Sequence, residues 1–449
     1  MSPSLSVSQI LGPEHRPTNE VRCPVHGFIA YSNAEKAVID SPPFQRLRSI
    51  RQLAYTHYVY PGAMHSRFEH SLGVMELATR AFDAVSSVEG TPLLDELGEV
   101  GGLETDTVAR ARQLVRLLGL LHDVGHTPFS HAGEVIAGEQ RHEHVSAWAV
   151  SRDGPLGDML DERFFPGVAG LLQTMLLEKD VPPQLLCLKQ IVSGQLDVDR
   201  IDYLLRDSHH CGVEYGKFDY LRLLGSLVAH RNANTQSLAI GIRPGGVHAF
   251  EGLLLARYFM NTQVYMHRTR RAYDVLLRNW LDFAVPGGYA DAAAVLQEDD
   301  VTMQSRMILD ARGSDAEPGS VWARRLIGRD HPKLLLEFGD HADHRDKRRM
   351  NEISAVLQQE FPSVVLVPDL DASGKVHSLW VPGEQDAADD LFVIESSARA
   401  SVRAISIAER SAVIEKVPKL FWVIRLFAYA RDDAQAENLR ARAEELARG

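Results

Sequence analysis

The chain has 449 residues, of which 45% are hydrophobic and 24% are charged, and its formal net charge is −12. This length allows a large core and a second, smaller domain. The acidic balance excludes a globally basic surface that coats nucleic acid non-specifically, but it leaves nucleic-acid binding by a local group of cations open.

The sequence lacks signals for secretion and for a disulfide framework. Residues 1–17, MSPSLSVSQILGPEHRP, contain neither a basic leading segment nor a long apolar run, and no stretch reaches the roughly 20 apolar residues that span a bilayer. With only three cysteines, we expect a cytoplasmic protein without a membrane partner. Cys23 and His26 have the spacing of metal ligands, but no second pair matches them, so we interpret both as structural.

Helices dominate the elements expected in the first part of the chain. Residues 1–20 are expected to be a flexible tail, followed by short helices over 21–70. Apolar side chains at helical spacing predict an amphipathic helix over 71–85. Further helices are expected at 108–123, from His142 onward, at 184–206 and, as one or two long helices, at 247–284. One strand is expected at 237–242.

The composition changes near residue 286. Residues 286–345 are richer in Gly, Asp and Arg, and we interpret them as connecting structure. The β-branched and aromatic segments that follow predict strands at 363–368, 377–382, 391–396 and 420–430, with helices at 348–359 and 434–448. The chain is therefore predicted to be mainly α-helical, with a body at 21–285 and a smaller α+β lobe within 286–449.

The segment 120–134, LLHDVGHTPFSHAGE, predicts a metal centre. His122 and Asp123 end an apolar helical run, and the loop after them carries His126, His131 and Glu134. Neutral imidazole and carboxylate suit Fe, Mn, Ni, Zn or, with more water, Mg. Histidines placed against the dipole at the end of a helix would explain one or two of these side chains, but not the whole set.

Carboxylates that suit the same cation occur in QLDVDRIDYLLRD. On a helix, Asp199, Asp202 and Arg206 share one face, with Asp197 preceding them. One of these carboxylates is expected to complete the metal site together with His70. Alternatively, the acidic face is simply solvated.

A row of mainly basic side chains lies on the helix expected after residue 266. His267, Arg270 or Arg271, Asp274 and Arg278 recur at helical spacing. A solvated helix face has the same pattern, and the functional interpretation is a rim that binds a polyphosphate.

The order of these segments resembles the HD-domain metal-dependent phosphohydrolases, which are defined by an H…HD…D pattern. Here that pattern is His70, His122-Asp123 and Asp199. The segments at 44–48, 61–74, 122–134 and 197–212 resemble more closely the deoxynucleoside triphosphate triphosphohydrolases, which include bacterial dGTPases and the mammalian dNTPase linked to a sterile alpha motif. The resemblance covers 21–274, is weaker beyond, and implies a helical HD-domain catalytic core.

The resemblance also implies roles for individual residues. The metal ligands would be His70, His122, Asp123 and Asp199. The catalytic dyad would be His131 with Glu134, and His126 and His142 would lie beside the phosphates. Substrate would be bound by Gln52, Leu53, Arg67, Arg200, Tyr203, Asp207, His267, Arg271 and Tyr273, with Leu53 against the ribose 2′ position and Tyr273 near the base. Asp274 replaces a Gln of the mammalian enzyme.

Regulation and assembly follow from the same resemblance. Asp40, Gln45 and Arg48 match part of a nucleotide activator site, although Arg22-Cys23 stands where the mammalian enzyme has Asn-Asp. Some members of the family need a guanine nucleotide activator and assemble as tetramers, so a homo-oligomer (dimer, tetramer or hexamer) is expected.

The implied reaction is attack of a metal-activated water on the α-phosphorus of a dNTP, which releases a deoxynucleoside and inorganic triphosphate. One alternative is an HD-type nucleotidase or phosphodiesterase that acts on other nucleotides or on single-stranded nucleic acid. A second alternative is a non-catalytic nucleotide-binding protein, and the intact metal positions and dyad argue against it.

Overall fold

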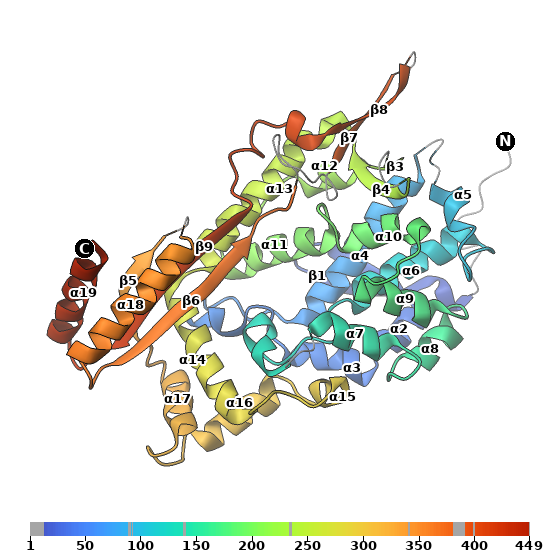
Figure 1. Ribbon diagram of the computed structural model, residues 1–449. Helices are drawn as coiled ribbons and strands as arrows, with labels where there is room; N and C mark the ends of the chain where they lie inside the picture. Colours follow the sequence, from blue (N-terminus) through green and yellow to red (C-terminus); the bar gives the residue numbers. More distant parts are fainter. Residues whose placement is uncertain are drawn as a thin grey trace.

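The computed structural model describes residues 13–88, 91, 93–137, 141–232, 236–339, 342–379, 391–397 and 400–448. A helical body occupies one side, and two long strands lead from it to a lobe formed by a sheet and two helices (Figure 1). The prediction of a mainly helical core with a smaller α+β lobe is therefore confirmed.

Three helices form the centre of the body. They are α4 (Arg67–Ser86), α6 (Thr107–Leu121) and α11 (Val198–Cys211), and α4 packs against both of the others. The predicted apolar face of α4 is buried, because its side chains belong to the main hydrophobic core. Two glycines permit close contact between these helices: a Cβ at Gly119 would lie 3.1 Å from the Val74 carbonyl oxygen, and one at Gly73 would clash with Asp202 at 2.0 Å.

Further helices surround this centre. They are α2 (Asn33–Ile39), α3 (Pro42–Gln45), α5 (Leu93–Leu97), α7 (His142–Val150), α8 (Gly157–Arg163), α9 (Val168–Leu177), α10 (Leu186–Val192), α12 (Tyr220–Leu224), α13 (Val247–Met260) and α14 (Arg268–Ala284). A π-helical turn at Asn261–Tyr265 separates α13 from α14. Such turns often mark functional sites.

The segment interpreted as connecting structure contains regular elements. They are α15 (Ala292–Leu296), α16 (Asp300–Asp310), α17 (Pro318–Ile327) and β5 (Lys333–Phe338). Helices α16 and α17 pack beneath α14, where they bury Trp280 and its apolar neighbours.

Three sheets are present in the described residues. The amino-terminal hairpin pairs β1 (Pro17–Cys23) with β2 (Gly27–Ser32). The second sheet has the order β3 (Leu227–Arg231), β4 (Leu238–Ile242), β7 (Phe392–Ser397), β8 (Ala400–Ser406). The third has the order β5, β9 (Leu420–Tyr429), β6 (Val365–Lys375), and α18 (His344–Glu360) and α19 (Asp433–Arg448) pack on it. Because β4 pairs with β7 in parallel, the carboxyl-terminal part of the chain returns to the helical body.

Several sequence-based expectations differ from the structure. The hairpin of β1 and β2 replaces the start of the expected short helices, and β1 begins inside the expected tail; residues 1–12 lie outside the described part. Strands β3, β5 and β8 were not expected. The strand expected at 377–382 is absent from the described residues 377–379, and 380–382 lie outside the description.

Candidate metal centre and substrate cavities

Three side chains from three helices converge on one point. His70 comes from α4, His122 directly follows α6, and Asp199 lies in the first turn of α11; their potential ligand atoms lie within 4.8 Å of one another. The His70 Nε2 and His122 Nε2 atoms lie 3.1 and 3.6 Å from Asp199 Oδ1. Both nitrogens are buried without a hydrogen-bond partner among the described residues. Unpaired imidazole nitrogens facing a carboxylate fit a divalent cation.

Asp123 adds a second carboxylate to this cluster. Its oxygens lie 3.5 Å from His70 Nε2 and 3.4 Å from His122 Nε2. Arg67 forms an ion pair with Asp123. Although burial raises the pKa of Asp123, the Arg67 guanidinium and His122 lower it well below its usual value. The carboxylate is therefore ionised, as a metal ligand must be, and the structure brings all four predicted ligands together.

A buried network holds His70 from behind. Its Nδ1 atom lies 2.7 Å from Oδ2 of Asp202, which also pairs with Arg206 and contacts His26. Burial lowers the pKa of His70, but Asp199 and Asp202 together raise it to about 10. The same negative charge would favour a bound cation. Of the carboxylates considered on α11, Asp199 therefore faces the cluster and Asp202 supports it.

A second group of imidazoles adjoins the metal cluster. The Nδ1 atoms of His131 and His142 lie 2.8 and 2.9 Å from the same oxygen, Oε1 of Glu134. The His126 and His142 rings stack, with centroids 3.8 Å apart. Although burial raises the pKa of Glu134, the bonds from both histidines lower it. The predicted dyad is thus in hydrogen-bond contact, with its carboxylate shared by a second imidazole.

The loop before His131 has an unusual backbone. Phe129 and Ser130 have φ angles of 63° and 54°, in the left-handed region that non-glycine residues rarely adopt. The Ser130 hydroxyl accepts a hydrogen bond from Arg67 Nε at 2.8 Å and donates one to the Arg51 carbonyl at 2.7 Å. These contacts fix the loop against the segment that precedes Gln52.

Two cavities meet at this loop. A cavity of about 190 Å³ lies over the metal cluster, and a second of about 380 Å³ extends away from it. Both are lined by Gln52, Arg67, His131 and Tyr203. The second cavity is also lined by Leu53, Asp207, Arg271 and residues that the sequence did not suggest, namely Asn261, Tyr265 and 373–375 of β6.

Other predicted substrate residues lie elsewhere. The Arg200 guanidinium binds the carbonyls of Gly194 and Gln195, and Arg200 lines a neighbouring cavity of about 270 Å³. Tyr273 packs against Tyr58 and lines neither of the two cavities, because it is buried in a separate apolar cluster. His267 does not line them either. Arg271 reaches the second cavity while its guanidinium pairs with Asp369.

The residues matched to an activator site form a partly connected surface group. Arg48 Nε donates to Gln45 Oε1 at 2.8 Å, and its guanidinium lies 3.5 Å from the centre of the Phe68 ring. Asp40 pairs with Lys36 instead.

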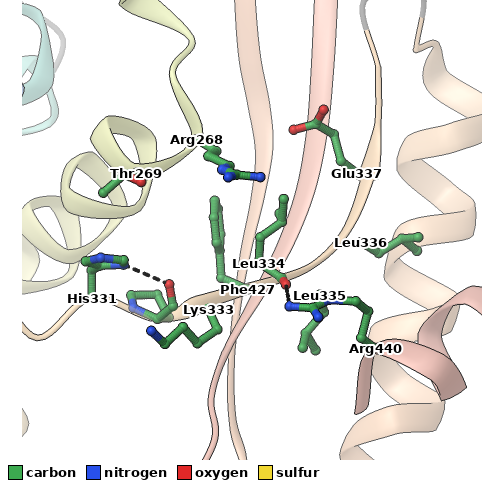
Figure 2. A pocket seen from close by; sticks show the side chains of 11 residues that line it. Arg268, Thr269, His331, Lys333, Leu334, Leu335, Leu336, Glu337, Phe427 and Arg440 are labelled. Carbon is green, nitrogen blue, oxygen red and sulfur yellow. Dashed lines mark hydrogen bonds between the residues drawn. The ribbon is translucent and has the colours of Figure 1, made fainter. Parts of the chain in front are cut away.

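A further cavity of about 540 Å³ is shown in Figure 2, and it shares no lining residue with the cavity over the metal cluster. Side chains of α14, β5, β9 and α19 surround it, among them Arg268, Lys333, Phe427 and Arg440. None of its lining residues was predicted as a site residue, although Arg268 and Thr269 lie on the same helix as Arg271.

Comparison with known families explains the metal cluster. Residues 67–207 match the HD domain, and residues 218–357 match the HD associated region. This chain carries an HD domain. HD domains bind divalent metals, and the cluster of His70, His122 and Asp199 supplies ligands for one. No described helix is long and apolar enough to cross a membrane.

Relatives extend over most of the chain. An uncharacterized protein of Bacillus subtilis is 28% identical over 88% of this chain and 88% of its own length. An uncharacterized protein of Methanocaldococcus jannaschii is 32% identical over 64% of this chain, which spans only 54% of that relative. A crystal structure of a hypothetical protein from Aquifex aeolicus superposes with a TM-score of 0.72 at 27% identity, over 94% of this chain and 99% of that one.

Relatives with a named activity match part of the chain. The deoxynucleoside triphosphate triphosphohydrolase SAMHD1 of Bos taurus is 33% identical over 45% of this chain and 37% of its own length. Together with the HD domain, such relatives support a hydrolase.

Proposed function

We propose that this protein hydrolyses deoxynucleoside triphosphates at the α-phosphate and releases a deoxynucleoside and inorganic triphosphate. One observation carries the proposal: His122, Asp123 and Asp199 of the metal cluster line one cavity together with His131. That cavity continues past Gln52 and Tyr203 into a second cavity. A phosphate at the metal thus leaves adjoining space for a nucleoside. The names of the partly matching relatives agree with this substrate class.

The bound cation would supply Lewis acidity, which acidifies a water and neutralises phosphate charge. Arg67 lines both cavities, so its guanidinium is placed to bind an α-phosphate oxygen as charge develops there. His131 would donate a proton from Nε2 to the departing 5′-oxygen of the deoxynucleoside. Glu134 accepts the Nδ1 hydrogen bond of His131, which orients the ring and stabilises its protonated form.

Gln52 and Leu53 are proposed to select the sugar. Gln52 is buried, and its Oε1 atom has no hydrogen-bond partner among the described residues, so it can accept a bond from a 3′-hydroxyl. Leu53 offers no polar partner to a 2′-hydroxyl and occupies space in the same wall. Asp207 accepts a hydrogen bond from the Tyr265 hydroxyl, so we include Tyr265 in the proposed sugar site.

The deciding experiment offers each dNTP with Mn, Fe or Mg and identifies the phosphate product. Release of inorganic triphosphate supports the proposal. Release of pyrophosphate or monophosphate would instead indicate an HD-type nucleotidase or phosphodiesterase. Nucleotide activation and a homo-oligomer stay predictions that the same preparation can test by kinetics and by light scattering. The cytoplasmic location also stays a prediction.

A further inference from the structure

Asp300, the first residue of α16, binds two backbone amides that belong to distant segments. The residue is 3% exposed. The Oδ1 atom accepts a hydrogen bond from the Phe129 amide at 2.7 Å, and the Oδ2 atom accepts one from the Arg51 amide at 3.0 Å. Asp300 lies in the HD associated region, beyond every residue to which the sequence assigned a role.

Helix capping does not explain this arrangement. The cap of α16 is the preceding residue, Asp299, whose Oδ1 accepts from the amides of Val301 and Thr302, both at 2.9 Å. The amides in the first turn of α16 therefore have a hydrogen-bond acceptor without Asp300. A buried carboxylate is also unfavourable for stability unless it is well hydrogen-bonded. Burial raises the pKa of Asp300 to about 6, which leaves it ionised at neutral pH.

The two donors lie in the two segments that carry the candidate site. Phe129 has the left-handed backbone noted above and precedes His131 by two residues. Arg51 directly precedes Gln52, and its carbonyl receives the Ser130 hydroxyl. The Asp300 carboxylate thus links the wall of the cavity that carries His131 to the wall that carries Gln52 and Leu53.

We propose that Asp300 is a positioning residue that holds the loop of His131 and the segment of Gln52 in a fixed relation across the substrate cavity. The roles of those two residues rest on the proposed function, whereas the contacts of Asp300 do not. A carboxylate offers an acceptor to each amide. Asparagine offers one acceptor and one N–H donor, so one buried amide would face another donor and lose its partner.

The first test needs no substrate. Amide hydrogen exchange is measured on the full-length, metal-loaded protein and on Asp300→Asn, with Asp299→Ala as the matched control. We expect exchange at Arg51 or Phe129 to accelerate at least about tenfold in Asp300→Asn, because a buried amide loses its acceptor. In Asp299→Ala, faster exchange should be confined to the first turn of α16. Unchanged exchange at both amides in Asp300→Asn would overturn the proposal.

The second test uses the ratio of kcat/KM for dGTP and GTP, which does not depend on the folded fraction. Asp300→Asn should lower this ratio several-fold and lower kcat by about tenfold or more, because small displacements at a reacting group are costly. Asp299→Ala should leave the ratio unchanged, and Asp300→Glu should restore part of it. A ratio unaffected by Asp300→Asn contradicts the positioning role. If the wild type releases no triphosphate, the proposed function fails, and the exchange experiment alone decides the role of Asp300.

Discussion

The Nδ1 atom of His70 lies 2.7 Å from Oδ2 of Asp202, so the ring that presents Nε2 to the metal cluster is held on its other side by a buried carboxylate. Such contacts fix the orientation and basicity of a ligand, and their loss typically weakens metal binding about 10- to 100-fold. We expect Asp202→Asn to lose metal affinity within that range. Metal titration measures this, with Asp197→Asn as control, since Asn still caps α11. Equal affinities in the two variants would contradict the support role.

Substitution of a metal ligand should reduce metal binding more than substitution of Asp202 does. His122→Ala and Asp199→Ala should lose bound metal and activity together, because each removes an atom that faces the cation site. Asp123→Ala should behave in the same way and also leave Arg67 without its ion-pair partner. Elemental analysis of the purified variants checks this. Full metal occupancy in all three would show that the cation lies elsewhere.

Substitutions in the dyad of His131 and Glu134 should lower turnover without changing the metal content. His131→Ala is expected to lower kcat by a factor of about 10² to 10⁴, the usual contribution of a general acid or base. Glu134→Ala should lower kcat less, because Glu134 orients the proton donor and does not transfer the proton itself. Steady-state kinetics on metal-replete protein tests both changes. Wild-type rates in both variants would show that the pair is not catalytic.

Sugar discrimination should depend on Leu53. The wild type should prefer dGTP over GTP, because the apolar side chain leaves a 2′-hydroxyl without a partner and restricts its space. Leu53→Gly should narrow this preference, whereas Leu53→Met, of similar volume, should retain most of it. The comparison uses kcat/KM for both nucleotides in each protein. Equal values in the wild type would refute the sugar assignment.

Acid should destabilise the helical body through the buried pair of Glu35 and Arg116. Burial raises the pKa of Glu35, but the pairing with Arg116 lowers this pKa by more than burial raises it. The folded-state pKa therefore lies below the unfolded-state value of about 4.5. This stabilisation is therefore present above about pH 4.5 and is lost as the pH falls through the folded-state value. Glu35→Gln should cost about 3–5 kcal/mol at pH 7, because it leaves Arg116 buried without a charge partner.

Denaturant unfolding at pH 7 and pH 4 measures both effects. The double variant Glu35→Leu, Arg116→Met serves as control, since an apolar pair of similar size is often close to neutral in stability. A wild-type free energy of unfolding that does not change between the two pH values would contradict the role of this pair.

Local patterns predicted much of the site. The ligands His70, His122, Asp123 and Asp199 lie in segments whose helical period and sequence motifs are visible without a structure, and the structure brings them together. The pattern on the helix face left Asp199 and Asp202 as alternatives, and the resemblance to the HD-domain family assigned Asp199. The position of α4 gives the structural reason, because Gly73 allows Asp202 to approach from behind His70.

Contacts between distant segments account for what was not predicted. The hairpin strand β1, PTNEVRC, is half-exposed and largely polar, so it carries no apolar alternation that would predict a strand. Asp300 lies in the stretch interpreted from the sequence as connecting structure, and only the tertiary fold shows that it reaches Phe129 and Arg51. The displacement of Tyr273 from the cavity follows from apolar packing below α14, which its position in the sequence does not reveal.

The wall of the second cavity formed by residues 373–375 of β6 has a consequence for biosynthesis. All four predicted metal ligands have been synthesised once residue 199 is added, well before the ribosome reaches β6. Amino-terminal regions generally fold first during synthesis. A nascent chain can therefore assemble its metal centre while the second cavity is still open on one side, and this cavity is complete only after residues 373–375 have been synthesised.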